Sequence, residues 1–368
     1  MFATSNTKPF RSIFCILPPH ILIQIAKNGT QEQRDAALAA LSLDHSLRTN
    51  RLTFHLSGGL QVSHEPIGGA ASPQKQRTIY DARHSQNLPG QLVRSEGQAP
   101  VADQSVNRAY EGLGDTFDFY LAAYQRNSID NLGLPLHATV HYDRNYDNAF
   151  WNGQQMVFGD GDAKIFIDFT GSVDVIGHEL THGVTGSEAN LNYQGQSGAL
   201  NESISDVFGS CVKQHKLQQT ADAADWLIGA GILAKGIQGV ALRSMKAPGT
   251  AYDDPTLGKD PQPADMKHYL QTAEDNGGVH INSGIPNRAF YLVASAIGGS
   301  SWVKAGQIWY DTLTDSRLKA SANFAAFANL TLLNANRRYG AGSTESKAVI
   351  DAWNTVGVKI ASHLAAGA

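Results

Sequence analysis

The segment "VIGHELTHGVTG", residues 175 to 186, carries two histidines four positions apart, with a glutamate beside the first. On an α-helix, residues four apart lie on one face, so His178 and His182 can direct their imidazoles at one point. That spacing is typical of two ligands of a zinc ion. Glu179 lies about 100° round the helix from His178, where it reaches a water on the metal without being a ligand. The pattern therefore predicts a metal site with a general base beside it.

A catalytic zinc generally has three protein ligands and one open position, so a third ligand is required. The segment "SGALNESISDVFG" supplies Glu202, twenty residues after His182 on the next predicted helix. Asp206 is four residues further on and can accept a hydrogen bond from the free ring nitrogen of His178, while Asn201 can do the same for His182. We expect one zinc ion per chain, bound by His178, His182 and Glu202.

The motif has a plainer interpretation. Two histidines of a buried helix can be satisfied by backbone carbonyls, and Glu202 can lie on a solvated face. By itself the motif is only suggestive. The segments that follow it decide between the two interpretations.

Composition and charge exclude several classes of protein. The chain has 368 residues, of which 42% are hydrophobic and 17% charged, as in globular proteins of two to three domains. The net charge is only −4, and no basic run interleaved with aromatics offers a site for nucleic acid. No stretch reaches the roughly 18 apolar residues of a membrane-spanning helix. The two cysteines, Cys15 and Cys211, lie in regions that we place in different parts of the molecule, so we expect no disulfide.

Three regions follow one another along the chain. Residues 1 to about 68 are predicted to hold one helix beginning at the Pro18–Pro19 pair and a second with Thr30 as N-cap, before a linker rich in Gly, Ser and Pro. Residues 77 to 170 alternate in hydrophobicity and indicate twisted antiparallel strands after a helix. Beyond residue 170 the pattern is mainly helical.

Five segments of this sequence resemble the signature segments of the thermolysin-like zinc metalloproteases, the M4 family, in order and spacing. They are "DNAFWNGQQMVFGDGD" (147–162), "GHELTHGVT" (177–185), "GALNESISDVFG" (198–209), "ALRSM" (241–245) and "DNGGVHINSG" (275–284). The resemblance runs from about Arg77 to near residue 358. It implies an α+β fold of two domains, with a β-rich N-terminal half, a mainly helical C-terminal half and the zinc site in the cleft between them. We divide the chain into a propeptide (1–68), a β-rich domain ending in the zinc-binding helix (69–190) and a helical domain (191–368).

The resemblance implies a neutral endopeptidase. Zinc lowers the pKa of a water and polarises the peptide carbonyl, while Glu179 takes the proton and passes it to the leaving nitrogen. Tyr193 and His280 are implied as donors to the negative charge that develops on the carbonyl oxygen. Asp275 is implied to orient the imidazole of His280.

The resemblance also assigns residues that hold the substrate. Asn148 and the backbone of Ala149 and Trp151 are implied to pair with an extended peptide, and Arg243 to bind a substrate carbonyl; a turn and a surface ion pair are the alternatives. An apolar pocket for the residue after the scissile bond is expected to prefer Leu, Ile, Val or Phe. Its walls are Phe166, Val175 and Leu242.

The carboxylate clusters that hold calcium in many members of the family are broken here. Asp174 is present, but Lys213 stands where the family pattern has a glutamate, and Leu227 and Ala230 replace further carboxylates. An ammonium at the centre of the site opposes a dication. We therefore expect structural calcium to be absent or reduced, with Lys213 paired to Asp174 instead.

Residues 1–68, here called the leader, resemble the short propeptide that precedes the catalytic domain in the protealysin-like subgroup. The subgroup implies that residues 1–68 block the cleft as an intramolecular inhibitor and are removed by self-processing in the linker. A permanent regulatory or docking module is the rival interpretation. Cys15 is either a thiol that switches the zinc or a small core residue.

No continuous apolar signal core forms near the N-terminus, because Pro18, Pro19, His20 and Gln24 interrupt it. We therefore expect a protein made in the cytoplasm without a conventional signal peptide and released by a non-classical route. We also expect a monomer that acts on proteins or peptides.

Two other functions stay open, a catalytically silent zinc scaffold that binds extended peptides and a zinc hydrolase of another kind. The simultaneous presence of Glu179, Tyr193 and His280 argues against the first, and the "DNAFW" segment against the second.

Overall fold

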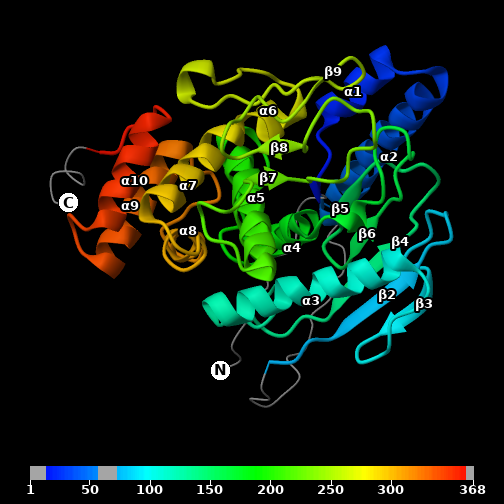
Figure 1. Cartoon of the computed structure of the whole chain (residues 1–368), viewed down its shortest axis with the longest axis horizontal. Coiled ribbons are helices and arrows are strands. Elements are labelled where there is room, and N and C mark those ends of the chain that lie inside the picture. The colour runs from blue at the N-terminus through cyan, green and yellow to red at the C-terminus, as the bar shows by residue number, and fades with distance from the viewer. Residues whose placement is uncertain (1–13, 57–72, 362–368) are drawn as a thin grey trace.

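The computed structural model describes residues 14–56 and 73–361. The chain has an α+β fold, in which the N-terminal half contains a mixed sheet and the C-terminal half is helical (Figure 1). The predicted propeptide boundary at residue 68 lies outside the described residues. Among the described residues, no helix combines the length and the apolar character needed to cross a membrane.

The leader contains the short strand β1 (Phe14–Cys15) and the two predicted helices, α1 (Pro19–Asn28) and α2 (Gln31–Leu56). Pro19 occupies the first turn of α1, where a missing N–H costs nothing. A capping box begins α2: the Thr30 N–H donates to Gln33 Oε1 at 2.8 Å, and the Gln33 N–H donates to Thr30 Oγ1 at 3.4 Å. The helices lie beside the sheet and next to the loops of the C-terminal half (Figure 1).

The sheet has six strands in the order β1-β5-β6-β4-β2-β3. The strands after β1 are β2 (Arg77–Asp81), β3 (Gln91–Ser95), β4 (Leu136–Val140), β5 (Ala149–Trp151) and β6 (Met156–Phe158). The prediction of antiparallel strands was partly wrong, because β4 runs parallel to both β2 and β6. The helix α3 (Gln104–Tyr124) carries the chain from β3 back across the sheet, which allows β4 to run parallel to β2.

The helical half is built around two long helices, α4 (Val173–Ser187) and α5 (Gly195–Leu217). They pack at short distance because Gly209 has no side chain: a Cβ there would lie 2.5 Å from the Asp174 carbonyl oxygen. The remaining helices are α6 (Asp275–Asn282), α7 (Gly284–Ile297), α8 (Ala305–Leu313), α9 (Phe324–Tyr339) and α10 (Thr344–Thr355). Short strands form two small sheets, β7 (Leu227–Ile228) with β8 (Arg243–Ser244), and β9 (Asp253–Asp254) with β10 (Gly258–Lys259). Two 3-10 turns, Phe169–Gly171 and Met266–His268, complete the described elements.

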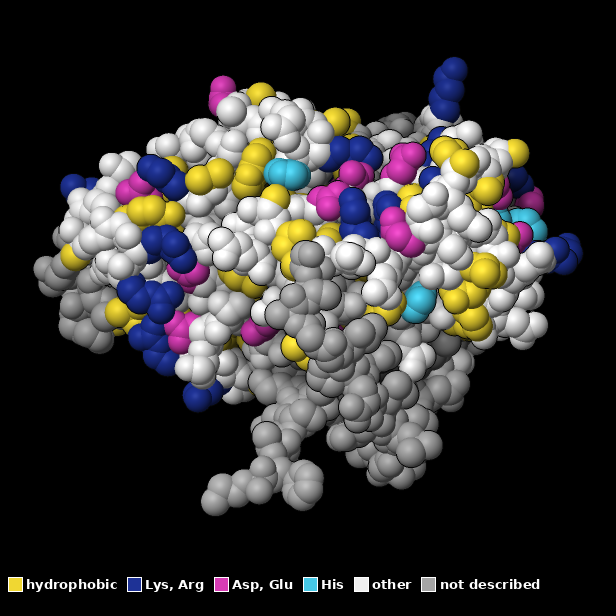
Figure 2. Space-filling model, turned by 90° about the horizontal axis from the view of Figure 1, so that it is seen from below, with side chains coloured by type: hydrophobic (Ala, Val, Ile, Leu, Met, Phe, Trp, Pro, Cys, Tyr) yellow, Lys and Arg dark blue, Asp and Glu magenta, His cyan; other side chains and the backbone are white. Residues whose placement is uncertain are grey.

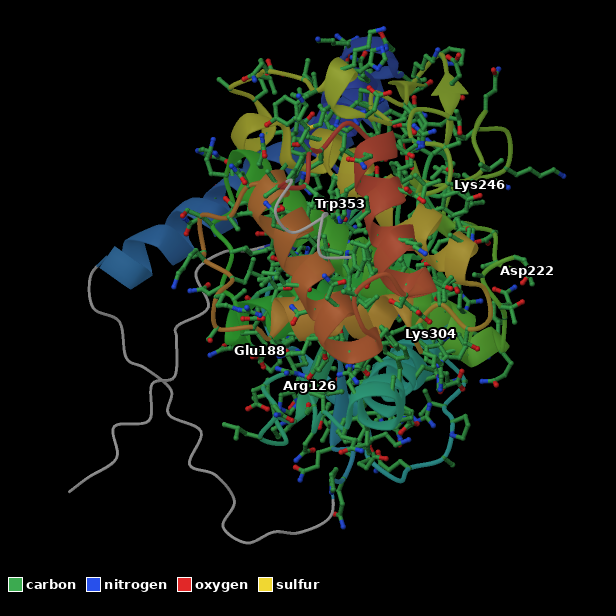
Figure 3. The ribbon with its side chains drawn as sticks, turned by 90° about the vertical axis from the view of Figure 1, so that its left-hand side faces the viewer. Arg126, Glu188, Asp222, Lys246, Lys304 and Trp353 are labelled. Carbon is green, nitrogen blue, oxygen red and sulfur yellow. The ribbon has the colours of Figure 1, made fainter. Side chains whose placement is uncertain are left out.

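A buried arginine ties the ends of two helices together. Arg126 follows α3 and its Nη1 lies 2.6 Å from Oε1 of Glu188, which follows α4 (Figure 3). The same guanidinium donates to the Ile129 carbonyl oxygen at 2.6 Å. These bonds hold the C-terminal end of α4 against the N-terminal half. On the face seen in Figure 2, Lys and Arg side chains alternate with Asp and Glu and form no continuous basic stripe.

His141 follows β4 and joins two carboxylates of the N-terminal half. Its Nδ1 lies 2.8 Å from Asp160 Oδ1 and its Nε2 lies 2.8 Å from Asp103 Oδ2. The bond to Asp160 raises the pKa of His141 to about 9 despite partial desolvation, and the bond to Asp103 adds to the shift.

The histidine is therefore expected to make stability depend on pH. A raised pKa stabilises the folded state fully below the unfolded value of about 6.5, and this stabilisation is lost as pH rises through about 9. We expect the free energy of unfolding to fall between pH 6.5 and 9.5, and His141→Asn to remove this part of the slope. Urea unfolding of both proteins across this range measures it. Parallel pH slopes in the two proteins would contradict the assignment.

Candidate metal centre and its surroundings

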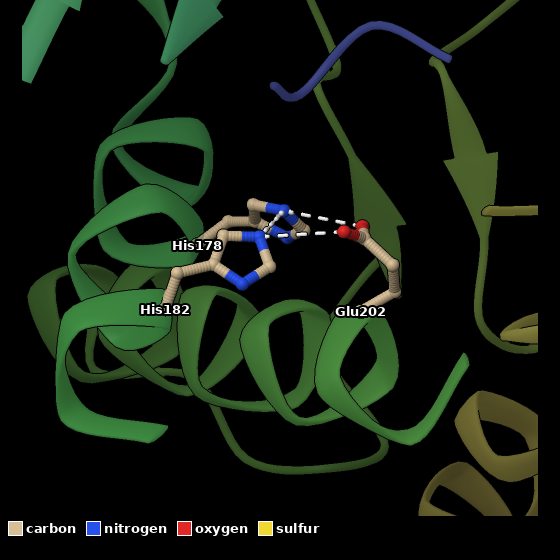
Figure 4. Close-up of side chains that lie close together, drawn as sticks. All are labelled: His178, His182 and Glu202. Atoms are coloured by element: carbon tan, nitrogen blue, oxygen red, sulfur yellow. Dashed lines mark hydrogen bonds and ion pairs between the residues drawn. The ribbon is translucent and has the colours of Figure 1, made fainter. Parts of the chain in front are cut away.

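Three buried side chains converge between α4 and α5. His178 and His182 extend from one face of α4 and Glu202 from α5, so that their ligand atoms all lie within 4.8 Å of one another (Figure 4). The two Nε2 atoms are 3.0 Å apart, and the Glu202 carboxylate lies 3.5 Å from His178 Nε2 and 3.4 Å from His182 Nε2. Among the described residues, these three form the one group of His, Cys, Asp or Glu side chains placed closely enough to hold a metal ion. Cys15 is not part of this group.

The chemistry of these donors fits zinc. Two imidazoles and one carboxylate are a known ligand set of catalytic zinc. Burial lowers the pKa of His182 well below its usual value, and the neighbouring His178 adds to this, so His182 is neutral as a ligand must be. Glu202 Oε2 is buried and accepts no hydrogen bond from the described residues. Two inward-facing Nε2 atoms and a carboxylate with one oxygen that accepts no hydrogen bond form a site that a cation would complete.

The outer nitrogens of both histidines are held by α5. Nδ1 of His178 lies 2.7 Å from Asp206 Oδ1, and Nδ1 of His182 lies 2.8 Å from Asn201 Oδ1 and 3.0 Å from Ser205 Oγ. These bonds fix the ring orientations and leave both Nε2 atoms facing Glu202. Ser205 had no role in the sequence prediction, although it lies one residue before Asp206.

Asp206 is the centre of a buried polar network. Besides His178 it accepts two bonds from Arg243, from Nε and Nη2, both at 2.8 Å, and one from Asn287 Nδ2 at 2.8 Å. Burial by itself would raise the pKa of Asp206, but Arg243 and His178 outweigh it and keep the pKa below its usual range.

Glu179 is buried beside the edge strand β5. Its Oε2 accepts a hydrogen bond from the backbone N–H of Trp151 at 3.0 Å, while its Oε1 accepts none from the described residues. Burial raises the pKa of Glu179 well above its usual value, and the Glu202 carboxylate adds to the shift. This bond occupies the Trp151 N–H, so that atom is not free to pair with a peptide.

The loop before α6 brings His280 to the same place. Residues 276 to 278 adopt left-handed backbone conformations, with φ of 51°, 84° and 74°, two of them at glycines. This tight turn lets Asp275 reach back to His280, whose Nδ1 lies 2.7 Å from Asp275 Oδ1. The Tyr193 hydroxyl lies 3.2 Å from His280 Nε2 and also bonds Glu202.

An extended segment of the leader runs along β5. Cys15 pairs antiparallel with Phe150, and the Ile16 N–H donates to the Ala149 carbonyl oxygen at 3.1 Å. The Leu17 N–H donates to Asn148 Oδ1 at 3.0 Å, and Arg243 Nη1 donates to the Ile16 carbonyl oxygen at 3.0 Å. Asn148, Ala149 and Arg243 therefore all bind one extended peptide, which belongs to the chain itself.

Two further residues of this contact were not predicted. Asp44 of α2 accepts from the Tyr146 hydroxyl at 2.6 Å and from Asn148 Nδ2 at 2.9 Å, and is buried. Asp44 has no sequence signal beyond being an acidic residue in a largely polar helix. Tyr146 lies just before the "DNAFW" segment, which was the one available hint.

The three predicted pocket residues are all buried in the hydrophobic core. Val175 is on α4, Phe166 pairs with Leu233 in a short bridge, and Leu242 precedes β8. Ile16 and Leu17 of the leader belong to the same core. The three residues and the two leader residues are therefore all shielded from water.

Lys213 occupies the position at which the family pattern has a glutamate. Its Nζ is 2.9 Å from Asp174 Oδ2, 2.8 Å from Asp225 Oδ1 and 2.6 Å from the Leu227 carbonyl oxygen. Burial by itself would lower the pKa of Lys213, but Asp174 and Asp225 outweigh it and raise the pKa above its usual value. A single ammonium thus neutralises the buried Asp174.

Residues 69–186 match the family model "Thermolysin metallopeptidase, catalytic domain", and residues 189–358 match "Thermolysin metallopeptidase, alpha-helical domain". The chain is 55% identical to an extracellular metalloprotease of Pectobacterium carotovorum, covering 95% of this chain and 98% of the relative. It is 48% identical to protease PrtS of Photorhabdus, covering 94% of this chain and 92% of the relative.

The names of these relatives correct one prediction. We expected a cytoplasmic protein released by a non-classical route. The Pectobacterium relative is named an extracellular metalloprotease, and a Serratia marcescens protein, 46% identical over 79% of this chain and 80% of the relative, is named an extracellular minor metalloprotease, which points to secretion. The prediction was wrong because it rested on the absence of a recognisable signal core, and such an absence does not determine where a protein acts.

A solved structure gives the same result as the sequences. The precursor of protealysin, a metalloproteinase from Serratia proteamaculans, matches with a TM-score of 0.85 and 55% identity, over 94% of this chain and 100% of that chain. The match covers the leader as well as both halves. The chain therefore belongs to the thermolysin family of metallopeptidases and, within it, to the protealysin-like members.

Proposed function

We propose that this metallopeptidase is a zinc-dependent endopeptidase that acts outside the cell, cuts on the amino side of hydrophobic residues and is made as a self-processing zymogen. The observation that carries the proposal is the position of an extended peptide, the leader, on β5 beside Glu179 and the three metal-binding side chains. A single chain contributes every residue of the proposed site, which is consistent with a monomer.

The proposed mechanism assigns each residue a task. His178, His182 and Glu202 would hold zinc, which when bound would act as a Lewis acid and lower the pKa of a water. Glu179 accepts a proton from the attacking water and delivers it to the nitrogen of the leaving amine. Arg243 and Asn148 fix the peptide on the leaving side of the bond.

The other donors act on the carbonyl oxygen. His280 and Tyr193 donate to the negative charge that develops there, and Asp275 keeps the imidazole of His280 oriented and charged. The contact of Asp275 with Nδ1 of His280 leaves Nε2 directed at the peptide.

Specificity for a hydrophobic residue after the scissile bond is proposed from the apolar surroundings of Phe166, Val175 and Leu242. A charged side chain there would lose its hydration without gaining a partner. We expect a peptide with Leu after the cut to be hydrolysed on the order of 100-fold faster than the same peptide with Asp. Values of kcat/KM for the two peptides, measured after removal of the leader, check this. Equal values would show that the wall does not select.

We propose that residues 1–68 form the inhibitory leader, that residues 69–190 and 191–368 form the two catalytic domains, and that self-processing occurs in the linker. The support is that the leader forms hydrogen bonds with Asn148, Ala149, Arg243 and His280. These are the residues that we assign to substrate binding and catalysis. A peptide substrate cannot bind until the leader leaves.

We further propose that Lys213 replaces structural calcium. Lys213→Ala would leave Asp174 buried and uncompensated, which costs about 3–5 kcal/mol. We expect this variant to unfold at a lower urea concentration, and Lys213→Glu to regain stability when calcium is added to the zinc-loaded protein. The wild type should gain nothing from calcium. Calcium-dependent stability of the wild type would contradict the proposal, and Lys216→Ala, which changes a more exposed lysine of the same helix, is the control.

A further inference from the structure

The way in which the leader lies on β5 selects one of its own peptide bonds. We propose that the Cys15–Ile16 bond is seated as a substrate bond and is hydrolysed by the enzyme itself, in a cut separate from the one in the linker. This inference rests on the proposed function, since it uses the same residues on a substrate that the chain supplies.

The residues after the bond are held as the leaving side of a substrate would be. Both polar backbone atoms of Ile16 are bonded: its N–H donates to Ala149 and its carbonyl oxygen accepts from Arg243. The Leu17 N–H donates to Asn148. These three bonds fix the register of the leader to a single residue, because a slip by one residue would move each backbone group away from its partner.

The carbonyl before the bond lies beside the proposed catalytic donors. The Cys15 carbonyl oxygen is 3.2 Å from His280 Nε2, which is also 3.2 Å from the Tyr193 hydroxyl. The preceding residue, Phe14, pairs antiparallel with Trp151, whose backbone N–H donates to Glu179 Oε2 at 3.0 Å. The remaining oxygen of Glu179 is buried and accepts no hydrogen bond from the described residues, so it is available to a water. Among the described carbonyls of the leader, the Cys15 carbonyl is therefore the one that lies within hydrogen-bond distance of His280.

The chemical step needs only water. Its hydroxyl adds to the Cys15 carbonyl carbon, the C–N bond breaks, and the proton goes to the Ile16 nitrogen, which leaves a Cys15 carboxylate and an Ile16 amine. After the cut, the new chain end remains held, because Ile16, Leu17, Ile21 and Leu22 are buried and α1 and α2 stay packed. The cut leader is therefore expected to remain an inhibitor, as slow substrate-like inhibitors do when their products cannot leave.

The test uses the full-length zinc-loaded protein. Incubated alone, it should accumulate chains that begin at Ile16 together with a fragment of residues 1–15, detected by intact mass and by labelling of new amino termini. The rate should not depend on protein concentration, because the leader is cut within its own chain. In Glu179→Gln the rate should fall at least about 100-fold.

A second measurement reports on the register without catalysis. In the Glu179→Gln protein, alkylation of Cys15 should be slow, as for the buried Cys211, because both side chains are fully covered. Ile16→Asp should speed alkylation of Cys15 at least tenfold, whereas the matched Ile16→Val should not. If Ile16→Asp leaves Cys15 protected, the seating of Ile16 in an apolar site is wrong.

The outcomes separate this inference from the function on which it rests. If protein freed of its leader by an added protease hydrolyses the Leu peptide, but Cys15–Ile16 stays intact or the cut falls at a neighbouring bond, the inference is wrong and the proposed function stands. If the freed protein hydrolyses no peptide either, both are wrong. A Glu179-dependent terminus at Ile16 supports both.

Discussion

Replacing Glu179 with Gln is expected to lower the rate of peptide hydrolysis by on the order of 10²–10⁴-fold while zinc stays bound. The amide has nearly the same shape and can still accept the hydrogen bond from the Trp151 N–H, so the local structure should persist. It cannot accept a proton from water at neutral pH. The loss therefore falls on the chemical step, in kcat, rather than on metal affinity.

The measurement is kcat and KM on the Leu peptide, after the leader has been removed by an added protease, with zinc content determined on the same samples. Glu111→Gln, a change of the same kind on an exposed position of α3, is the matched control and should leave both values unchanged. If Glu179→Gln kept more than a tenth of the wild-type kcat, Glu179 would not be the general base. Loss of zinc from this variant would show a structural role instead.

Replacing Asp206 with Ala is expected to have the largest effect on stability. This carboxylate is fully buried and accepts bonds from His178, Arg243 and Asn287. Its removal leaves the Arg243 guanidinium buried with no carboxylate partner, which costs about 3–5 kcal/mol of unfolding free energy. It also frees the ring of His178, which should weaken zinc binding by about 10–100-fold.

Urea unfolding of the zinc-free protein isolates the effect on stability, and competition with a chelator measures the affinity for zinc. Asp206→Asn keeps an acceptor for His178 and should lose less of both. Asp222, an exposed carboxylate at the surface labelled in Figure 3, is the control, and Asp222→Ala should change stability by less than about 0.5 kcal/mol. Equal unfolding midpoints for the Asp206→Ala and Asp222→Ala proteins would contradict the role of Asp206 as the centre of the network.

The sequence by itself determined the elements and the local chemistry of the metal site. The spacing of His178 and His182 needs only a helix to bring them together, and the Thr30 capping box and the Pro18–Pro19 pair mark helix starts within a few residues. These features depend on interactions between near neighbours in the chain, so they can be inferred without the fold. The resemblance of five segments to one family then supplied the partners from distant parts of the chain.

Only the tertiary structure decided how distant segments meet. It made β4 parallel where alternation suggested antiparallel strands, because the path of α3 rather than the strand sequence fixes direction. It gave Arg243 two partners, Asp206 and the Ile16 carbonyl, and assigned Asp44 to Asn148, across more than 100 residues in each leader contact. The register of Cys15 and Ile16 on β5 depends on where α1 and α2 pack. The sequence could not predict it, because backbone hydrogen bonds do not depend on which side chains the paired residues carry.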